Sequence, residues 1–257
     1  MPVTLLVIAA AGGAFFHTLR THGLSERDTV ILADFDNSTG DLVFDDTLKQ
    51  ALAVDLEQSP FLNILSDRKV ADSLQLMGRK PDERLTQDLA REVCQRSGSK
   101  AVLGGSIANL GSQYVVGLNA MNCQTGEKLV REEVRTNGKE NVLKALDKAV
   151  SDVRGKLGES LSSIQKFDTP LEEASTSSLE ALQAYTTAVR TTLSKGSPDA
   201  IPFFRHAVDL DPNFALAYLS LGVMYSNMGQ VTLARTPERL TSCVREQERE
   251  REIPHFC

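Results

Sequence analysis

The chain has 257 residues, enough for one large or two modest domains, and its 41% apolar and 24% charged residues are ordinary for a globular protein. The formal net charge of −6 leaves no basic surplus to replace counterions on phosphates, so nucleic acid is not expected as a partner. Four scattered cysteines are too few for a disulfide scaffold or a zinc knuckle.

The amino-terminal segment predicts a membrane helix. No formal side-chain charge precedes Arg20, and the run from Val3 to Phe16 is apolar. Nineteen helical residues at about 1.5 Å each reach about 28 Å, close to the hydrocarbon thickness of a bilayer. We therefore expect a membrane-spanning or anchor helix at 1–20, with membrane contact through residues 3–19. The alternatives are a buried helix of a soluble domain and a cleaved signal, which ordinarily begins with basic residues.

Residues 28–165 alternate between strand-like and helix-like patterns. Strands are expected at 29–35, 61–65, 100–110, 113–122 and 128–136. Helices are expected at 44–58, 70–77, 86–94 and 138–157. In the first helix Leu48, Leu52 and Leu56 form the apolar stripe, and Lys49 and Asp55 fall elsewhere. This order predicts an α/β fold in which helices pack on a mixed sheet.

The same order resembles the periplasmic α/β domain at the TolB amino terminus and in curli-secretion and flagellar-associated lipoproteins. The residues that carry the resemblance are Val30–Asn37, which read VILADFDN, and the hairpin residues Gln124–Glu127. The resemblance implies a TolB-like sheet and a place in the cell envelope.

One motif in this unit is enzyme-like. Asp34 and Asp36 follow an apolar strand, with Ser38-Thr39 just beyond. Haloacid-dehalogenase-type phosphatases place Asp-x-Asp-x-Thr there, and both carboxylates hold magnesium. Such enzymes also need a downstream lysine and an acidic pair on later strand ends, where this sequence has no carboxylate pair. We interpret the acids as turn residues and keep a cryptic magnesium-dependent phosphatase on Asp34 and Asp36 as an alternative.

Other catalytic and metal-binding motifs are missing from the sequence. It contains no Walker loop, no Gly-x-Gly-x-x-Gly and no Gly-x-Ser-x-Gly. The four histidines never place two on one helical face. We expect no cofactor and no metal ion, and we predict that the chain is not an enzyme.

Two of the cysteines, Cys94 and Cys123, are candidates for a disulfide. An antiparallel hairpin about Gly111-Ser112 pairs residues whose numbers sum to about 223, which puts Cys123 opposite Lys100. Cys94 ends the helix before this strand, so the two Cα atoms can approach disulfide range. Two separate buried thiols are the alternative, and a location outside the cytoplasm favours the bridge.

Residues 166–230 predict one to two tetratricopeptide repeats. Small and aromatic residues recur at the spacing of that repeat, whose period of 34 separates Ala200 from Ala234. The first repeat is weaker, with Thr187 where leucine is usual. The second fails in its second helix, where Pro237 interrupts the pattern. Residues 231–257 are therefore expected to form a charged atypical tail.

The whole order resembles the extracytoplasmic sensor portion of acidobacterial eukaryotic-like serine/threonine protein kinases. The segments that carry the resemblance are Thr29–Phe35, Phe44–Leu52 and the repeats. The kinase domain is absent, since the chain has no Gly-rich loop, no His-Arg-Asp and no Asp-Phe-Gly. The resemblance thus implies anchored sensing and docking in the periplasm, without catalysis.

These observations favour a membrane-anchored, non-enzymatic protein-interaction module of α/β and helical-repeat architecture. Its repeat groove would bind a protein partner. In the usual repeat geometry, the groove positions are Tyr185, Leu219, Val223 and Asn227. A component of envelope secretion or assembly, built on the same α/β unit, is a further alternative.

Overall fold

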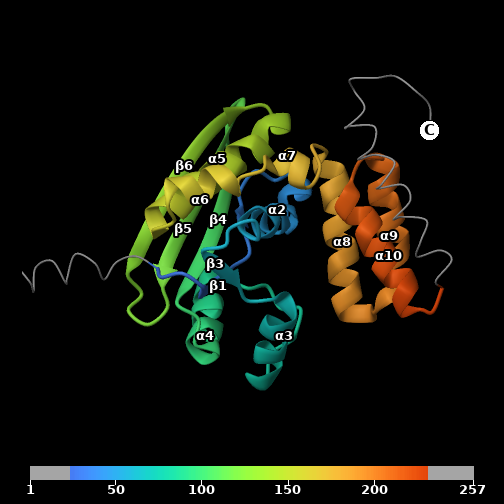
Figure 1. Cartoon of the computed structure of the whole chain (residues 1–257), viewed down its shortest axis with the longest axis horizontal. Helices are drawn as coiled ribbons and strands as arrows, with labels where there is room; N and C mark the ends of the chain where they lie inside the picture. Colours follow the sequence, from blue (N-terminus) through green and yellow to red (C-terminus); the bar gives the residue numbers. More distant parts are fainter. Residues whose placement is uncertain (1–23, 231–257) are drawn as a thin grey trace, which may run out of the picture.

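The computed structural model describes residues 24–230, and within them the strands form one mixed sheet (Figure 1). The strands are β1 (Asp28–Leu32), β2 (Asp36–Asn37), β3 (Leu62–Ile64), β4 (Ala101–Leu110), β5 (Gln113–Asn122) and β6 (Lys128–Asn137). Their order is β3-β1-β4-β5-β6, and the short β2 pairs with β4. β1 runs parallel to β3 and β4, whereas β4, β5 and β6 form an antiparallel meander.

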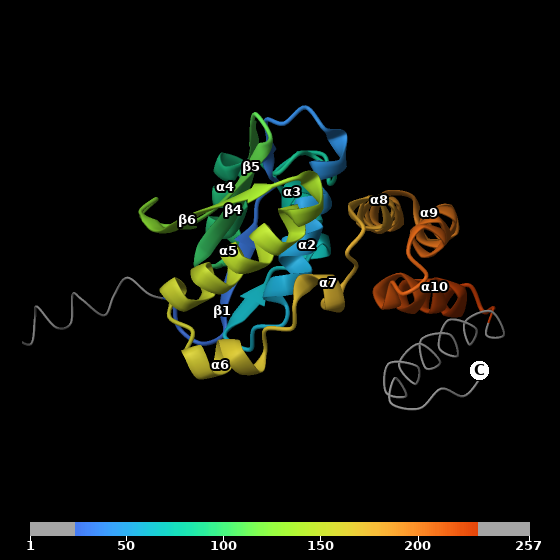
Figure 2. The same ribbon diagram turned by 90° about the horizontal axis from the view of Figure 1, so that it is seen from above.

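Helices pack on both faces of the sheet. These helices are α2 (Thr47–Leu56), α3 (Asp67–Leu76), α4 (Gln87–Ser97) and α5 (Val142–Leu157). α2 and α5 share one apolar cluster with the sheet, and α3 and α4 share a second. Figure 2 shows α5 and α4 on opposite sides of the sheet. The predicted α/β fold class is confirmed.

The alternation of side chains along β1 explains this double cover. Val30 and Leu32 belong to the cluster of α2 and α5, and Ile31 and Ala33 belong to that of α3 and α4. A central parallel strand is buried on both faces and is therefore apolar throughout. In the edge strand β6, by contrast, Val130 is buried and exposed charged residues follow it at every second position.

The β4–β5 hairpin has the register that its turn predicts. Ala101 lies opposite Asn122 and Leu110 lies opposite Gln113, so the partner numbers sum to 223. Lys100 and Cys123 continue the pairing, because the Cys123 amide donates to the Lys100 carbonyl oxygen at 3.0 Å. The tight turn needs a positive φ, which Gly111 supplies with φ 67°.

Several predicted elements begin or end elsewhere in the structure; the expected helix 138–157, for example, begins only at Val142. The expected strand 29–35 stops at Leu32, and a separate two-residue strand, β2, follows. The expected helix 44–58 begins only at Thr47, because Leu42–Phe44 forms a short 3-10 turn, η1, and Asp46 adopts a left-handed φ of 58°. A residue in that conformation interrupts a right-handed helix.

The carboxyl-terminal half of the described chain is helical. After the turn η2 (Lys139–Asn141) and α5 come α6 (Leu161–Lys166), α7 (Leu171–Ala174), α8 (Leu179–Lys195), α9 (Ser197–Leu210) and α10 (Ala215–Asn227). Ser178 caps α8, since its side chain accepts from the Ala181 amide. Figures 1 and 2 show α8, α9 and α10 packed side by side next to the sheet domain.

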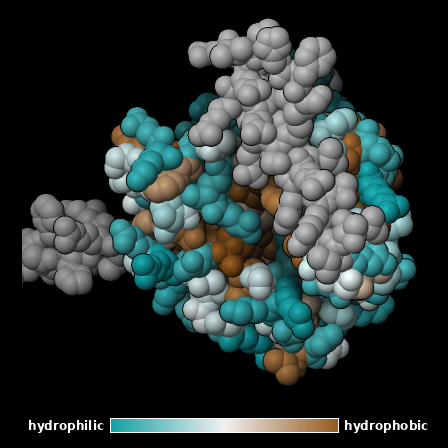
Figure 3. All heavy atoms as spheres, turned by 45° about the vertical axis from the view of Figure 1, so that its right-hand side comes forward, coloured by the Kyte–Doolittle hydropathy of each residue, from teal (hydrophilic) through white to brown (hydrophobic). Residues whose placement is uncertain are grey.

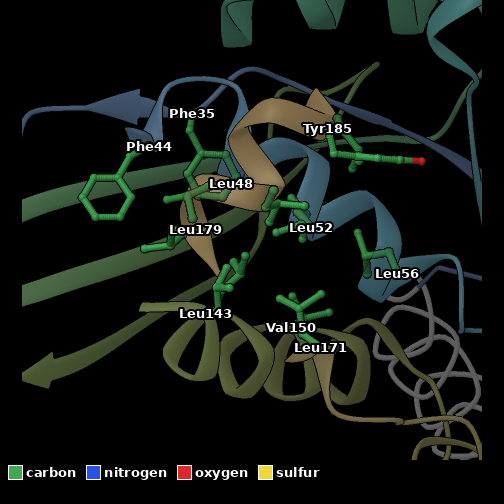
Figure 4. Close-up of a cluster of buried hydrophobic side chains, with 14 of the residues drawn as sticks. Phe35, Phe44, Leu48, Leu52, Leu56, Leu143, Val150, Leu171, Leu179 and Tyr185 are labelled. Atoms are coloured by element: carbon green, nitrogen blue, oxygen red, sulfur yellow. The ribbon is translucent and has the colours of Figure 1, made fainter. Parts of the chain in front are cut away.

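α8 packs directly on the α/β unit. Leu179 and Tyr185 of α8 lie in the same buried cluster as Leu48 and Leu52 of α2 (Figure 4). Gln183 Nε2, in the side chain, donates to the Leu42 carbonyl oxygen at 3.1 Å. The helical segment and the sheet domain thus share one hydrophobic core.

Two expected segments, the membrane helix at 1–20 and the charged tail at 231–257, lie outside the described residues. Between residues 24 and 230, no helix combines the length and apolar character that crossing a membrane requires.

Candidate interaction site

An uncharged stripe of exposed side chains runs along α10. Leu219 and Val223 are 44% and 54% exposed, and Asn227 is also exposed. Residues four apart lie on one face of a helix, so these three predicted site residues come together. α10 contains no charged residue anywhere between Ala215 and Asn227. An apolar face of this kind, open to solvent, is typical of a surface that binds another molecule.

The opposite face of α10 is its packing face. Ala217, Leu221, Met224 and Tyr225 are buried in the shared core. The Tyr225 hydroxyl accepts from Arg205 Nε of α9 at 2.9 Å. α10 is therefore held on one side by its neighbours and leaves the Leu219–Val223 side open.

Tyr185, the fourth predicted site residue, is separated from this stripe. It is buried, and its ring packs against those of Phe204 and Phe214, with centroids 5.5 and 5.1 Å away. Its hydroxyl lies 3.3 Å from that of Ser220 on α10. The structure thus places Tyr185 in the contact between α8 and α10, beneath the exposed side chains.

The electrostatic surroundings of Tyr185 include an acid from the α/β unit. Burial raises the pKa of the Tyr185 hydroxyl, its hydrogen bond with Ser220 opposes that rise, and the negative charge of Glu57 adds to it. Glu57 directly follows α2, and burial also raises the pKa of its own carboxyl, as does Asp67. Among the described residues, no cation forms an ion pair with Glu57.

Asp34 and Asp36, the predicted phosphatase pair, occupy different environments. One Asp34 oxygen accepts from Lys49 Nζ at 2.7 Å, and the other accepts from the Leu85 amide at 2.6 Å. The Asp36 side chain is 77% exposed and lies 3.5 Å from Arg84. Asp34 thus ties the end of β1 to α2 and to the segment before α4. Within residues 24–230, no cluster of His, Cys, Asp and Glu is arranged to hold a metal ion.

A buried charged cluster joins α5 to the chain that leads into the repeats, and sequence reasoning missed it. Arg154 is fully buried and pairs with Glu159 at 2.9 Å and with Asp168 at 2.7 Å. Nearby, Asp55 of α2 is fully buried, and neither of its carboxylate oxygens has a hydrogen-bond partner. Burial, with the charges of Asp147 and Asp168, raises the pKa of Asp55 to about 8. In the sequence, the only indication of this buried cluster was that Asp55 is a charged residue beside the apolar stripe of its helix.

Cys94 and Cys123 are joined as a disulfide between α4 and the turn after β5. Their Cα atoms lie 6.0 Å apart, and both residues are buried. Two α4 side chains also hold the turn, because Arg91 Nε and Gln95 Nε2 donate to the Cys123 carbonyl oxygen at 2.9 and 2.8 Å.

A family model described as tetratricopeptide repeat matches residues 203–236, which supports the repeat prediction there. No curated protein matches the sequence.

Several solved structures are similar to this chain. The LpoB C-terminal domain from Salmonella enterica is 18% identical over 47% of this chain and 90% of that chain, with a TM-score of 0.42. Lipoprotein GNA1162 from Neisseria meningitidis is 16% identical over 52% of this chain and 99% of that one, with a TM-score of 0.37. TolB from Acinetobacter baumannii is 13% identical over 53% and 29%, with a TM-score of 0.36. At these identities and scores, the similarity carries no conclusion about function.

Proposed function

We propose that this chain is a non-enzymatic protein-interaction module of the cell envelope, and that the exposed face of α10 binds a segment of another protein. The observation that carries the proposal is the exposed, uncharged stripe of Leu219 and Val223 inside the segment that matches the tetratricopeptide repeat. Apolar side chains that are held on a rigid helix are the usual anchors of a protein interface.

Two features support an envelope location. The Cys94–Cys123 disulfide is of a kind that persists in oxidising compartments and is rare in the cytoplasm. The apolar run at residues 3–19 has the length of a membrane anchor. These two features and the resemblance to kinase sensor portions favour an anchored module with most of its residues in the periplasm. They also favour a role in signal transduction.

The α/β unit supports the binding face in this proposal. Its polar side chains at the end of β1 are engaged in structural contacts, as the Asp34–Lys49 pair illustrates. Its core continues into α8, which in turn contacts α10 through Tyr185 and Ser220. A rigid support lowers the entropy cost of binding, because the face needs little rearrangement.

A pull-down from envelope extract tests the proposal. The full chain should retain one or a few proteins, and Leu219→Glu or Val223→Glu should reduce their recovery at least about tenfold, since each places a charge in an apolar contact. Leu76→Glu is the matched control, because Leu76 is 88% exposed on α3, in the sheet domain. Circular dichroism verifies that each variant folds.

The outcome that contradicts the proposal is equally specific. Partners that both α10 variants retain at the level of the unmodified chain would place the binding surface elsewhere. Loss of the same partners in Leu76→Glu would show that any added surface charge disturbs capture.

A further inference from the structure

We propose that the binding site is a composite groove, with α8 as its floor and α10 and α2 as its walls, and that its occupant is an amphipathic helix whose Lys or Arg side chain pairs with Glu57. This inference rests on the proposed function and adds the chemistry of the partner. It assigns the α/β unit a direct role in binding, which a repeat alone would not require.

The floor follows from the contacts of α8. On one side of α8, Gln183 forms a hydrogen bond with Leu42 and Arg190 forms one with Asp46, so this side faces the α/β unit. On another side of the helix, Tyr185 and Thr192 contact α10. At about 100° per residue, Val189 projects between these two sides. It is only partly buried, so α8 presents it to the space between α2 and α10.

The walls carry apolar side chains of the same kind. Ala53 and Val54 of α2 and Leu216 of α10 are partly buried hydrophobic residues that pack against the shared core. On α10 the exposed Leu219 and Val223 extend this wall outward. In Figure 3, apolar atoms gather in a hollow near the centre of the view, with hydrophilic atoms to its left and below it.

Glu57 supplies the charge that identifies the occupant. Glu57 follows Ala53 and Val54 by four and three residues, so it lies on the same face of α2 as this wall, at the carboxyl end of the helix. Its charge acts on the Tyr185 hydroxyl, which lies beside Ser220 of α10. Glu57 itself is exposed, and Asp67 adds negative potential. Among the described residues it has no cationic partner in an ion pair, and α10 offers none.

The ligand that fits combines two properties. Apolar side chains at helical spacing cover Val54, Val189 and Val223, which excludes water from the groove. A Lys or Arg near one end of the ligand helix restores a counter-charge to Glu57, and a charge-assisted hydrogen bond of this kind is among the stronger polar contacts. An acidic ligand meets repulsion from Glu57 and Asp67 instead.

A displayed peptide library tests this inference on the full chain. The probes are helical peptides of about 18 residues, with leucines fixed along one face and all charged positions randomised. Selection at neutral pH should enrich Lys or Arg near one end of the peptide. Fluorescence anisotropy then gives the Kd of a selected peptide for each variant.

Variants on both walls should weaken that peptide. Glu57→Gln should raise the Kd about tenfold, Glu57→Lys more, and Val54→Glu and Val223→Glu should abolish measurable binding. Glu92→Gln, an exposed acid on α4, is the matched control and should leave the Kd unchanged. Thermal denaturation identifies any variant that fails to fold.

The remaining outcomes overturn the inference. Loss of binding in Val223→Glu alone, with Val54→Glu and both Glu57 variants unchanged, would leave the α10 face as the site and remove α2 and the basic ligand from it. Enrichment of acidic or uncharged peptides, or of no peptide at all, also contradicts the composite groove. The pull-down tests the α10 face independently of all these results.

Discussion

The oxidation state of Cys94 and Cys123 is a residue-level property that depends on where the protein resides. With the bridge formed, alkylation followed by site-resolved mass spectrometry should label these two thiols only after reduction. The bridge closes a loop of 29 residues. Replacing both residues with alanine should lower the free energy of unfolding by about 3 kcal/mol, because the unfolded chain loses a constraint. Full labelling of both thiols without reductant would rule the bridge out.

Asp55 should make the stability of the fold depend on pH. Burial, with the charges of Asp147 and Asp168, raises its pKa to about 8 in the folded chain, from 3.8 as the ordinary value. Between these two values the folded state binds more protons than the unfolded state, so the contribution of Asp55 to stability falls as pH rises from about 4 to about 8.

Asp55→Asn removes this titration and is the direct check. Its free energy of unfolding relative to the unmodified chain should increase between pH 5 and pH 8, by about 1–3 kcal/mol, because only the unmodified chain carries a buried carboxyl that loses stability as the pH rises. Asp72→Asn, at an exposed acid on α3, serves as the control. Parallel urea titrations of the three proteins that show no pH-dependent difference would contradict the prediction.

The burial of two residues could not be predicted from the sequence. The helical pattern placed Asp55 off the apolar stripe, yet α2 packs so closely on α5 that Asp55 is fully buried. Tyr185 occupies a groove position by repeat spacing, yet the rings of Phe204 and Phe214 enclose it. In both cases the burial depends on residues distant in sequence, which local periodicity does not report.

At the level of elements, predictions succeeded where the local pattern determines the geometry. The Gly111 turn fixes the register of β4 and β5, and the repeat spacing identifies the exposed positions on α10. The two residues of β2 are too few to show a period of two, so that strand was not predicted. η1 and the left-handed Asp46 shortened a predicted helix, because charged residues at a helix start do not reveal the backbone conformation before it.

Packing between elements sets the character of the binding face. α10 buries Ala217 and Met224 on one side and exposes Leu219 and Val223 on the other, so the helix is apolar nearly all round. A helix with that composition is ordinarily buried on every side. A partner seated on its open face would therefore bury apolar area that the fold leaves exposed.

At the level of the whole molecule, the sequence predicted an α/β unit at 28–165 and repeats at 166–230, and the structure packs the two against each other. α8 packs on α2 and η1, and Arg190 pairs with Asp46 across the contact. Arg154 of α5 also holds the segment between α6 and α7 through its ion pair with Asp168. A ligand seated against α10 therefore lies next to the α/β unit and can be contacted by both.

Site-specific photo-crosslinking in the cells that produce the chain would capture a partner bound to α10. A photo-reactive phenylalanine analogue would replace Val223 in the full-length protein, and Leu76 in the control. A covalent adduct with a distinct protein is expected from position 223, and none of that species from position 76. Leu219→Glu, added to the chain labelled at position 223, should remove the adduct. Absence of any adduct at position 223, or the same adduct from both positions, would contradict a binding face on α10.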